Sequence, residues 1–220
     1  MIIAIHQPNY LPYYGYFHKI QKSDLFVFLD NVPYTKNSYI NRNRIKTAQR
    51  WSWLTVPIES KDVLKRAIRK VKISNVTNWQ KKHWKSLKYN YRKAKHFDEY
   101  KDFFKEVYGK KWVYLADLNE YLIKKVCSFL EIECNFLDAS ELDVSGSKTD
   151  LLINICETVG ADTYLSGQGG KGYLEEEKFR LCDINLRYQE PKQPKYTQLF
   201  GDFTPYLSIV DMLFCEGRLL

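Results

Sequence analysis

Residues 2–30 read IIAIHQPNYLPYYGYFHKIQKSDLFVFLD, and this stretch decides the fold. Ile2–Ile5 is a short apolar run, the loop His6–Tyr14 follows, and Gly15–Lys22 has the pattern of an amphipathic helix. Leu25–Leu29 is continuously apolar, as expected for a strand buried on both faces. A strand, a helix and a strand within about 30 residues form a βαβ unit, which predicts a parallel sheet.

The alternation of helix and strand patterns returns in the second half of the chain. The patterns predict helices over 118–132, 147–161 and 175–183, strands within 133–142, 162–174 and 184–190, and an apolar helix at the end of the tail from residue 196. Residues 41–58 alternate as a β-hairpin does. We therefore predict an α/β core domain made of residues 1–60 and 112–220, interrupted by an insertion over residues 61–111.

The predicted insertion carries most of the positive charge. The chain has a formal net charge of +8, yet residues 61–111 hold 17 Lys/Arg against five Asp/Glu, a local balance of +12 that leaves −4 for the rest. Residues 78–97 have helical periodicity and would place four cations on one face: Lys81, Lys85, Lys88 and Arg92. This basic, largely helical insertion is either a nucleic-acid surface, tRNA included, or a solvated helix face.

The cysteines and the hydropathy limit the class of protein. Five widely spaced cysteines with no C-x-x-C indicate reduced thiols and no zinc site, and we assign no residue as a metal ligand. The apolar runs fall short of the roughly 20 residues that span a bilayer, and the first residues lack the features of a signal peptide. We expect a cytoplasmic protein without a membrane span.

The loop after the first strand is the first candidate site, because ligands of open α/β sheets bind beyond the carboxyl ends of the strands. His6 follows the strand directly, where an imidazole can act as a general base or bond a ligand. Gln7 and Asn9 can bond a polar substrate, and Tyr10 would form a wall. The alternative is a histidine that orders the loop, beside ordinary turn residues.

The segment after the second strand is the second candidate. If residues 41–46 are extended, Arg42, Arg44 and Lys46 project from one face and favour a bound phosphate or diphosphate. The alternative is a solvated hairpin face. Asp30 ends the second buried strand, where it would hold a metal or a substrate amine, or cap the following turn.

The third candidate is the loop LSGQGGKGYL, residues 165–174, at the end of a predicted strand. Its glycines allow close backbone approach and an anion-binding nest, or simply a tight turn. His83 lies on the apolar side of the basic helix, where it would be either a satisfied core histidine or a residue pointing into the cleft.

Four blocks together resemble the WbqC-like protein family of bacteria: IIAIHQPNYLPYYGYFHKI, SDLFVFLDNVPYTKNSYINRNRIK, TYLSGQGGKGYL and FTPYLSIVDMLF. The resemblance extends from residue 2 to about residue 217. It implies a role in the synthesis of surface polysaccharides of the O-antigen type, next to enzymes that make and acylate unusual amino sugars.

A weaker, fold-level resemblance is to nucleotidylyltransferases of the HUP class, such as pantothenate synthetase, and implies a Rossmann-like sheet. Those enzymes bind ATP phosphates with an H-x-G-H block. Here Tyr13-Tyr14-Gly15-Tyr16 stands at that place, so the glycine matches and both histidines are absent. This departure argues against ordinary adenylyl transfer.

These observations lead to one leading hypothesis and two alternatives. The leading one is an enzyme that transfers an acyl or aminoacyl group, from acyl-CoA or aminoacyl-tRNA, to the amine of a nucleotide-linked amino sugar. The alternatives are an ATP-dependent ligase or nucleotidylyltransferase of the same fold, and a non-enzymatic RNA-binding module. We assign His6 and Asp30 as catalytic, and the substrate-binding set as Gln7, Asn9, Tyr10, Asn37, Arg42, Asn43, Arg44, Lys46, His83, Ser166, Gly167, Gly169 and Gly170.

Overall fold

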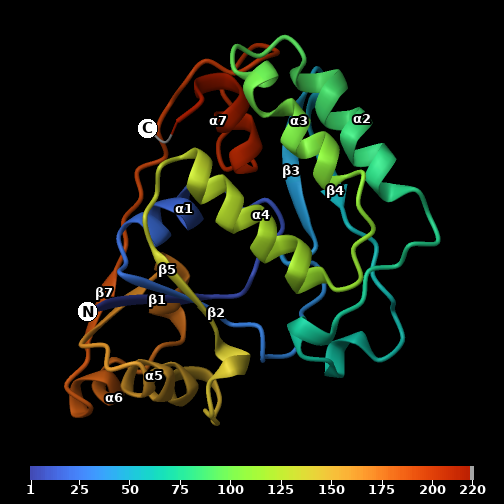
Figure 1. Ribbon diagram of the computed structural model, residues 1–220. Coiled ribbons are helices and arrows are strands. Elements are labelled where there is room, and N and C mark those ends of the chain that lie inside the picture. Colours follow the sequence, from blue (N-terminus) through green and yellow to red (C-terminus); the bar gives the residue numbers. More distant parts are fainter. Residues whose placement is uncertain (219–220) are drawn as a thin grey trace. The chain divides into compact units, whose positions relative to one another are not determined.

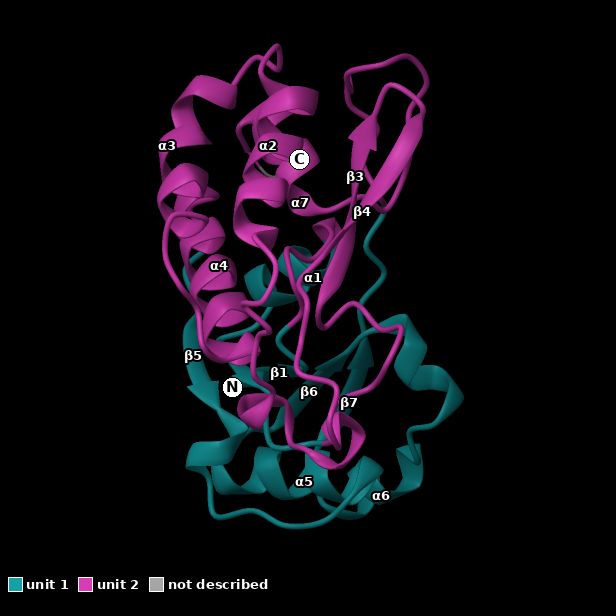
Figure 2. Ribbon diagram, turned by 90° about the vertical axis from the view of Figure 1, so that its right-hand side faces the viewer, with its two compact units in different colours: residues 1–8, 15–32, 132–192 teal, residues 9–14, 33–131, 193–220 magenta. Residues whose placement is uncertain are grey.

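The computed structural model describes residues 1–218, which divide into two compact units (Figure 2). Unit 1 comprises residues 1–8, 15–32 and 132–192, and unit 2 comprises residues 9–14, 33–131 and 193–220. No helix among the described residues has the length and hydropathy needed to cross a bilayer.

Unit 1 contains a five-stranded sheet in the order β5-β2-β1-β6-β7 (Figure 1). Every neighbouring pair is parallel, and the register aligns His6 with Phe28 and Phe28 with Asp138, so that the carboxyl ends of the strands lie at one edge. The Rossmann-like α/β fold predicted from the sequence is confirmed. The strands are β1 Ile2–His6, β2 Leu25–Phe28, β5 Asn135–Asp138, β6 Thr163–Ser166 and β7 Asn185–Tyr188.

Helices cover both faces of this sheet, which explains why β1 and β2 are apolar throughout. One face, with Ile3, Ile5 and Val27, shares a core with α5 Lys148–Thr158 and α6 Glu176–Leu181. On the other face, α1 Tyr14–Gln21 places the Tyr16 ring 5.3 Å from that of Phe26, and Phe28 stacks on Phe136 with ring centroids 5.6 Å apart. Two short 3₁₀ helices, η3 Ala139–Glu141 and η4 Gln168–Gly172, follow β5 and β6.

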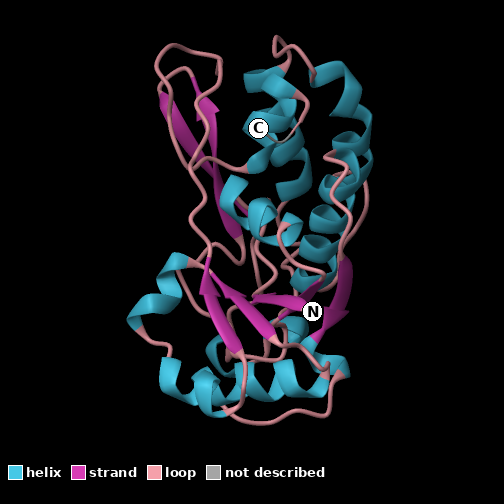
Figure 3. Ribbon diagram, turned by 90° about the vertical axis from the view of Figure 1, so that its left-hand side faces the viewer, coloured by secondary structure: helices cyan, strands magenta, loops and turns pink. Residues whose placement is uncertain are grey.

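Unit 2 combines helices with the antiparallel hairpin of β3 and β4, which forms a sheet of its own (Figure 3). The aromatic rings of Tyr91, Phe104 and Phe214 meet in its core at centroid distances of 5.3 Å. The elements are β3 Arg42–Thr47, β4 Arg50–Thr55, η1 Val63–Lys65, η2 Ile68–Lys70, α2 Trp79–Tyr91, α3 Phe97–Val107, α4 Leu115–Phe129 and α7 Ile209–Glu216.

The division into units differs from the expected insertion over residues 61–111, because unit 2 also takes the hairpin, α4 and the C-terminal tail. The reason is long-range packing, since Phe214 of α7 contacts Phe97 and Phe104 of α3. Unit 2 holds 26 Lys/Arg and 12 Asp/Glu, a net charge of +14, whereas unit 1 holds 8 and 14, a net charge of −6. The charge asymmetry is therefore larger between the two units than the insertion alone suggested.

Candidate functional site

The order of the strands places a topological switch point in unit 1. From β1 the chain passes through α1 to β2 on one side, whereas from β6 it passes through α6 to β7 on the other side. Ligands of open α/β sheets bind outside the carboxyl ends of the strands where the order reverses in this way. The candidate site of unit 1 therefore lies at the ends of β1 and β6.

His6 is the last residue of β1 and stands at this point. Its Nδ1 lies 3.0 Å from the Gln7 carbonyl oxygen and must donate to it, so Nε2 carries the lone pair. The Tyr16 ring meets the imidazole edge-on at 4.8 Å, and the Tyr16 hydroxyl donates to the same Gln7 carbonyl at 3.0 Å. Burial and then the charge of Lys19 lower the pKa of His6 to about 3, so the imidazole is neutral at physiological pH.

Lys19 on α1 is a component of the site that the sequence reasoning missed. Its side chain is 2 % exposed, and its Nζ donates to the Ile5 carbonyl oxygen at 3.4 Å, with no carboxylate paired to it in residues 1–218. Burial lowers the pKa of Lys19 to about 7. The sequence did carry one indication that Lys19 is buried: it lies three residues after Tyr16 and beside Ile20, on the apolar side of the predicted helix.

The loop after β6 begins at buried Ser166 and turns into η4. The Gly170 amide donates to the Gly167 carbonyl at 2.9 Å, and the Ser166 hydroxyl donates to that carbonyl at 3.1 Å. A β-carbon at residue 170 would overlap the Ser166 hydroxyl, so glycine is required there by packing. At Gly169 a β-carbon would have no described atom within 4 Å.

Gln189, just after β7, connects these pieces and was also missed. Its amide donates to the Ser166 carbonyl at 2.9 Å, and its Nε2 donates to the Gly15 carbonyl at 3.2 Å. Its Oε1 lies 3.2 Å from the Nδ1 of His18 on α1. Gln189 therefore fixes the β6 loop against the start of α1 at the switch point.

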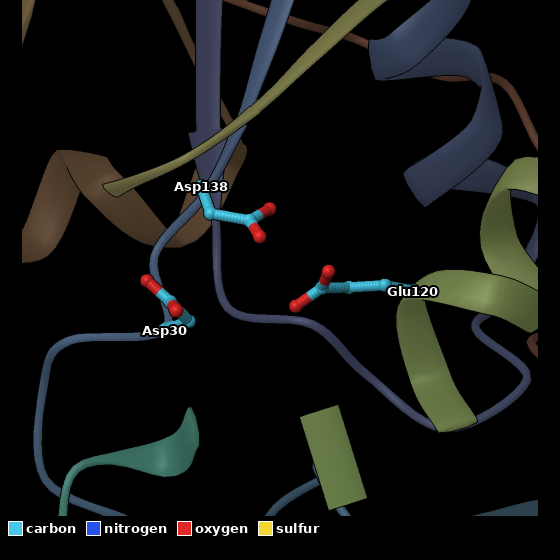
Figure 4. Close-up of side chains that lie close together, drawn as sticks. All are labelled: Asp30, Glu120 and Asp138. Carbon is cyan, nitrogen blue, oxygen red and sulfur yellow. The ribbon is translucent and has the colours of Figure 1, made fainter. Parts of the chain in front are cut away.

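Asp30 follows β2 and is only 3 % exposed. Its Oδ1 accepts from the Ser140 amide at 2.9 Å and supports η3, a segment distant in the sequence and not the turn that directly follows Asp30. One of its carboxylate oxygens lies within 4.8 Å of one of Asp138 at the end of β5. Figure 4 shows both side chains. Glu120, also drawn there, belongs to unit 2, where it pairs with Lys124 at 3.8 Å.

Three further candidate residues lie in the interior of unit 2. The Tyr10 hydroxyl bonds the Nδ1 of His83 at 2.8 Å, and the Nε2 of His83 donates to the Thr55 carbonyl at 3.2 Å. Both ring nitrogens are used, so His83 is a satisfied core histidine, and burial lowers its pKa to about 4. Asn43 donates to the carbonyls of Tyr10 and Leu11 at 3.3 and 2.7 Å and holds the loop in place.

The three cations of β3 do not share one environment. Lys46 is 2 % exposed, and its Nζ donates to Gln198 Oε1 at 3.3 Å, to Thr204 Oγ1 at 2.9 Å and to the Asp202 carbonyl. Arg42 and Arg44 instead lie over tryptophan rings of β4. Lys46 is therefore bonded internally and is not available to an anion together with Arg42 and Arg44.

Two predicted residues remain in loops of unit 2. Asn9 is half-buried, and Asn37 is exposed at a positive φ of 59°, where its carbonyl accepts from Arg42 Nη2 at 2.8 Å. Of the predicted site residues, His6, Gln7 and the loop Ser166–Gly170 lie together at one edge of the sheet in unit 1. The remaining substrate-binding candidates belong to unit 2.

Comparison with models of protein families shows to which family the chain belongs. The model of the WbqC-like protein family matches residues 7–219. The chain belongs to the WbqC-like protein family. The resemblance drawn from the sequence blocks is thereby confirmed. The WbqC-like chain is also similar to the uncharacterized protein Rv1507c of Mycobacterium tuberculosis, with 36% identity over 217 residues that cover 98% of this chain and 94% of the relative. No solved structure matches the chain.

Proposed function

We propose that this protein is a cytoplasmic enzyme that transfers an acyl or aminoacyl group to the amine of a nucleotide-linked amino sugar. The observation that carries the proposal is the buried Lys19 ammonium, which stands beside neutral His6 at the switch point without a carboxylate partner in residues 1–218. A buried charge without a partner is costly, so a site keeps it where a ligand supplies the opposite charge. The polysaccharide context implied by the family resemblance supports a sugar nucleotide as that anionic ligand.

The reaction forms a bond between the sugar nitrogen and the carbonyl carbon of the donor. The sugar ammonium first loses one proton to solvent, and the neutral amine then attacks. The bond from the carbonyl carbon to the donor oxygen or sulfur breaks, and the leaving oxygen or sulfur takes the second proton from the nitrogen. Lys19 has a pKa of about 7 without ligand, and a bound anion keeps it protonated, so Lys19 serves as the charge partner of the ligand and not as the proton acceptor. We assign to His6 the hydrogen bond that orients the amine, through the lone pair on Nε2, and to Asp30 the support of η3 after β5.

Two measurements test this proposal. Thermal shift assays with dTDP-, UDP- and GDP-linked amino sugars should show stabilisation, since a ligand at 100 times its Kd adds about 2.7 kcal/mol to the stability. Turnover should be lost in His6→Ala and in Lys19→Met but kept in Lys22→Met, a matched exposed lysine at the end of the same helix. A flat response to every sugar nucleotide, or full turnover in His6→Ala, would contradict the proposal.

A second candidate is an ATP-dependent ligase or nucleotidylyltransferase. The feature in its favour is Gly15 at the start of α1, where such enzymes carry the glycine of H-x-G-H. Against it, Tyr16 occupies one of the histidine places and packs on His6 and Phe26 as part of the interior. Release of AMP or pyrophosphate from ATP in the presence of the amino sugar would favour this candidate.

A further inference from the structure

The outward face of the β3–β4 hairpin in unit 2 alternates arginine and tryptophan. The antiparallel register pairs Arg44 with Trp53 and Lys46 with Trp51, so these side chains share one face with Arg42. The Arg42 guanidinium carbon lies 4.5 Å from the Trp53 ring centroid, and that of Arg44 lies 5.2 Å from Trp51 and 5.9 Å from Trp53. These are cation–π distances, so the two guanidinium groups are held in a fixed orientation on the indoles.

Neither arginine has an acidic partner in the part of the chain that the structure describes. One Nη2 of each donates to a backbone carbonyl, Arg42 to Asn37 at 2.8 Å and Arg44 to Tyr206 at 3.2 Å. The Nε atoms of both are buried and have no hydrogen-bond partner among the described residues. The buried Nε atoms are closed to a ligand, so what each oriented guanidinium offers at this face is its remaining Nη hydrogens.

Aromatic rings continue the surface around the arginines. Trp53 is 37% exposed, Tyr39 45% and Tyr206 55%. The Tyr39 ring lies 6.0 Å from Trp53, and the Trp51 ring lies 5.8 Å from Trp53. We call the set Tyr39, Arg42, Arg44, Trp51, Trp53 and Tyr206 the hairpin platform.

The charge of unit 2 extends well beyond the hairpin platform. The unit has a net charge of +14, and α2 exposes Lys81, Lys85 and Lys88, for which no acidic partner exists within residues 1–218. By contrast, Lys101 on α3 pairs with Asp98 at 2.5 Å. A ligand complementary to this unit is a polyanion, and the rings of the hairpin platform add a requirement for planar groups.

We propose that the hairpin platform binds a single-stranded segment of RNA. Bases that are not paired stack on aromatic side chains and on guanidinium planes, while Arg and Lys contact the phosphates. An acidic peptide would satisfy the charge but would leave the rings unused, and a duplex would keep its bases inside. A single nucleotide would use one ring and none of the cations along α2. The inference does not depend on the reaction proposed for unit 1.

The test measures fluorescence anisotropy of a labelled 12-nucleotide oligouridylate with the full chain. We expect Trp53→Ala to weaken binding about fivefold or more, because a stacked base is lost, and Trp53→Phe to restore most of the affinity. Arg42→Gln with Arg44→Gln should reduce the slope of log K against log salt by about 1.4, since each phosphate contact to a single strand contributes about 0.7.

The matched control is Lys101→Gln with Lys105→Gln, which removes the same formal charge from α3, where Lys105 is exposed and Lys101 is half-buried. This control should change affinity less than the arginine pair does. The proposal is overturned if both double variants weaken binding equally or if Trp53→Ala binds as well as the native chain. It is also overturned if uridine monophosphate, oligothymidylate or a poly-glutamate peptide binds as tightly as the RNA.

Discussion

Gly170 packs directly against the side chain of Ser166 at the switch point of unit 1. A β-carbon at residue 170 would overlap the Ser166 hydroxyl and lie 2.8 Å from the Leu174 Cδ1. The φ angle at Gly170 is not positive, so the constraint is steric and not conformational. The glycine thus lets the β6 loop fold back onto the end of its own strand.

Gly170→Ala should therefore destabilise the protein by about 1–3 kcal/mol, the usual cost of overpacking a filled space. Gly169→Ala and Gly172→Ala are the controls, because a β-carbon there meets nothing within 4 Å in the described structure. They should change the free energy of unfolding by no more than about 0.5 kcal/mol. Urea unfolding measures all three. If adding Ser166→Ala to Gly170→Ala restores no stability, the clash with the hydroxyl is not the cause.

Lys46 should be a structural residue of unit 2 and not part of an anion site. Lys46→Met leaves the acceptors on Gln198, Asp202 and Thr204 without their ammonium donor, and we expect a loss of about 3 kcal/mol in the free energy of unfolding. The segment 198–204 should then become sensitive to limited proteolysis. Lys36→Met, at an exposed position of the same unit, should be close to neutral. Equal stability of the two variants would show that the buried contacts contribute nothing.

Local sequence patterns were sufficient for the parallel sheet and the hairpin, because these depend on the periodicity of neighbouring residues. The same patterns did not predict that the side chain of Lys46 is buried. Period two places it with Arg42 and Arg44, yet residues 198–204 cover Lys46 alone. That packing joins segments about 150 residues apart, and no local pattern carries it. The assignment of α7 to unit 2 was missed for the same reason.

The candidate site was predictable only in part. His6 and the Ser166 loop were predicted because ligands of open α/β sheets bind beyond the carboxyl ends of the strands, and the strand order brings these loops to one edge. It could not select Lys19, since a lysine next to apolar residues on a helix normally extends its charged end into water. Whether a lysine ammonium group is buried depends on its tertiary contacts, which the local sequence does not show. Gln189 was missed because its role rests on three hydrogen bonds to distant segments.

The stability of the protein should fall on acidification through His83. Its native pKa of about 4 lies below the ordinary value of 6.5, so the unfolded chain binds more protons between these limits. Stability is therefore lost as the pH falls from 6.5 to 4, at up to about 1.4 kcal/mol per pH unit from this group. His83→Gln, which can keep both hydrogen bonds, should reduce that dependence in urea unfolding at pH 7.5, 6 and 5, leaving the part that comes from His6 with its pKa of about 3.

Tyr10→Phe provides the control for this pH dependence. It removes the hydroxyl that bonds His83 Nδ1 but keeps the imidazole. We expect a loss of about 1–2 kcal/mol that is the same at each pH. If His83→Gln shows the pH dependence of the native chain, the buried imidazole does not contribute to acid denaturation.

Lys19 should lower the stability of the protein, as a residue kept for ligand binding does. Its native pKa of about 7 lies below the ordinary 10.5, so the unfolded chain binds more protons between these values. The native chain consequently gains about 1.4 kcal/mol per pH unit between pH 7 and 10.5. Lys19→Met has no such penalty, so it should be more stable, with an advantage that is constant below pH 7 and shrinks above it.

The uptake of protons on ligand binding provides a second, independent test of the role of Lys19. An anion bound beside Lys19 raises the pKa of the ammonium, so at pH 7.5 the complex should take up about 0.7 proton. Titration calorimetry of UDP in two buffers with different ionisation enthalpies measures this number, which should fall to near zero in Lys19→Met and stay unchanged in Lys22→Met. A Lys19→Met variant that is less stable than the native chain and takes up the same number of protons would make Lys19 a structural residue, because neither its charge nor its proton would then respond to the ligand.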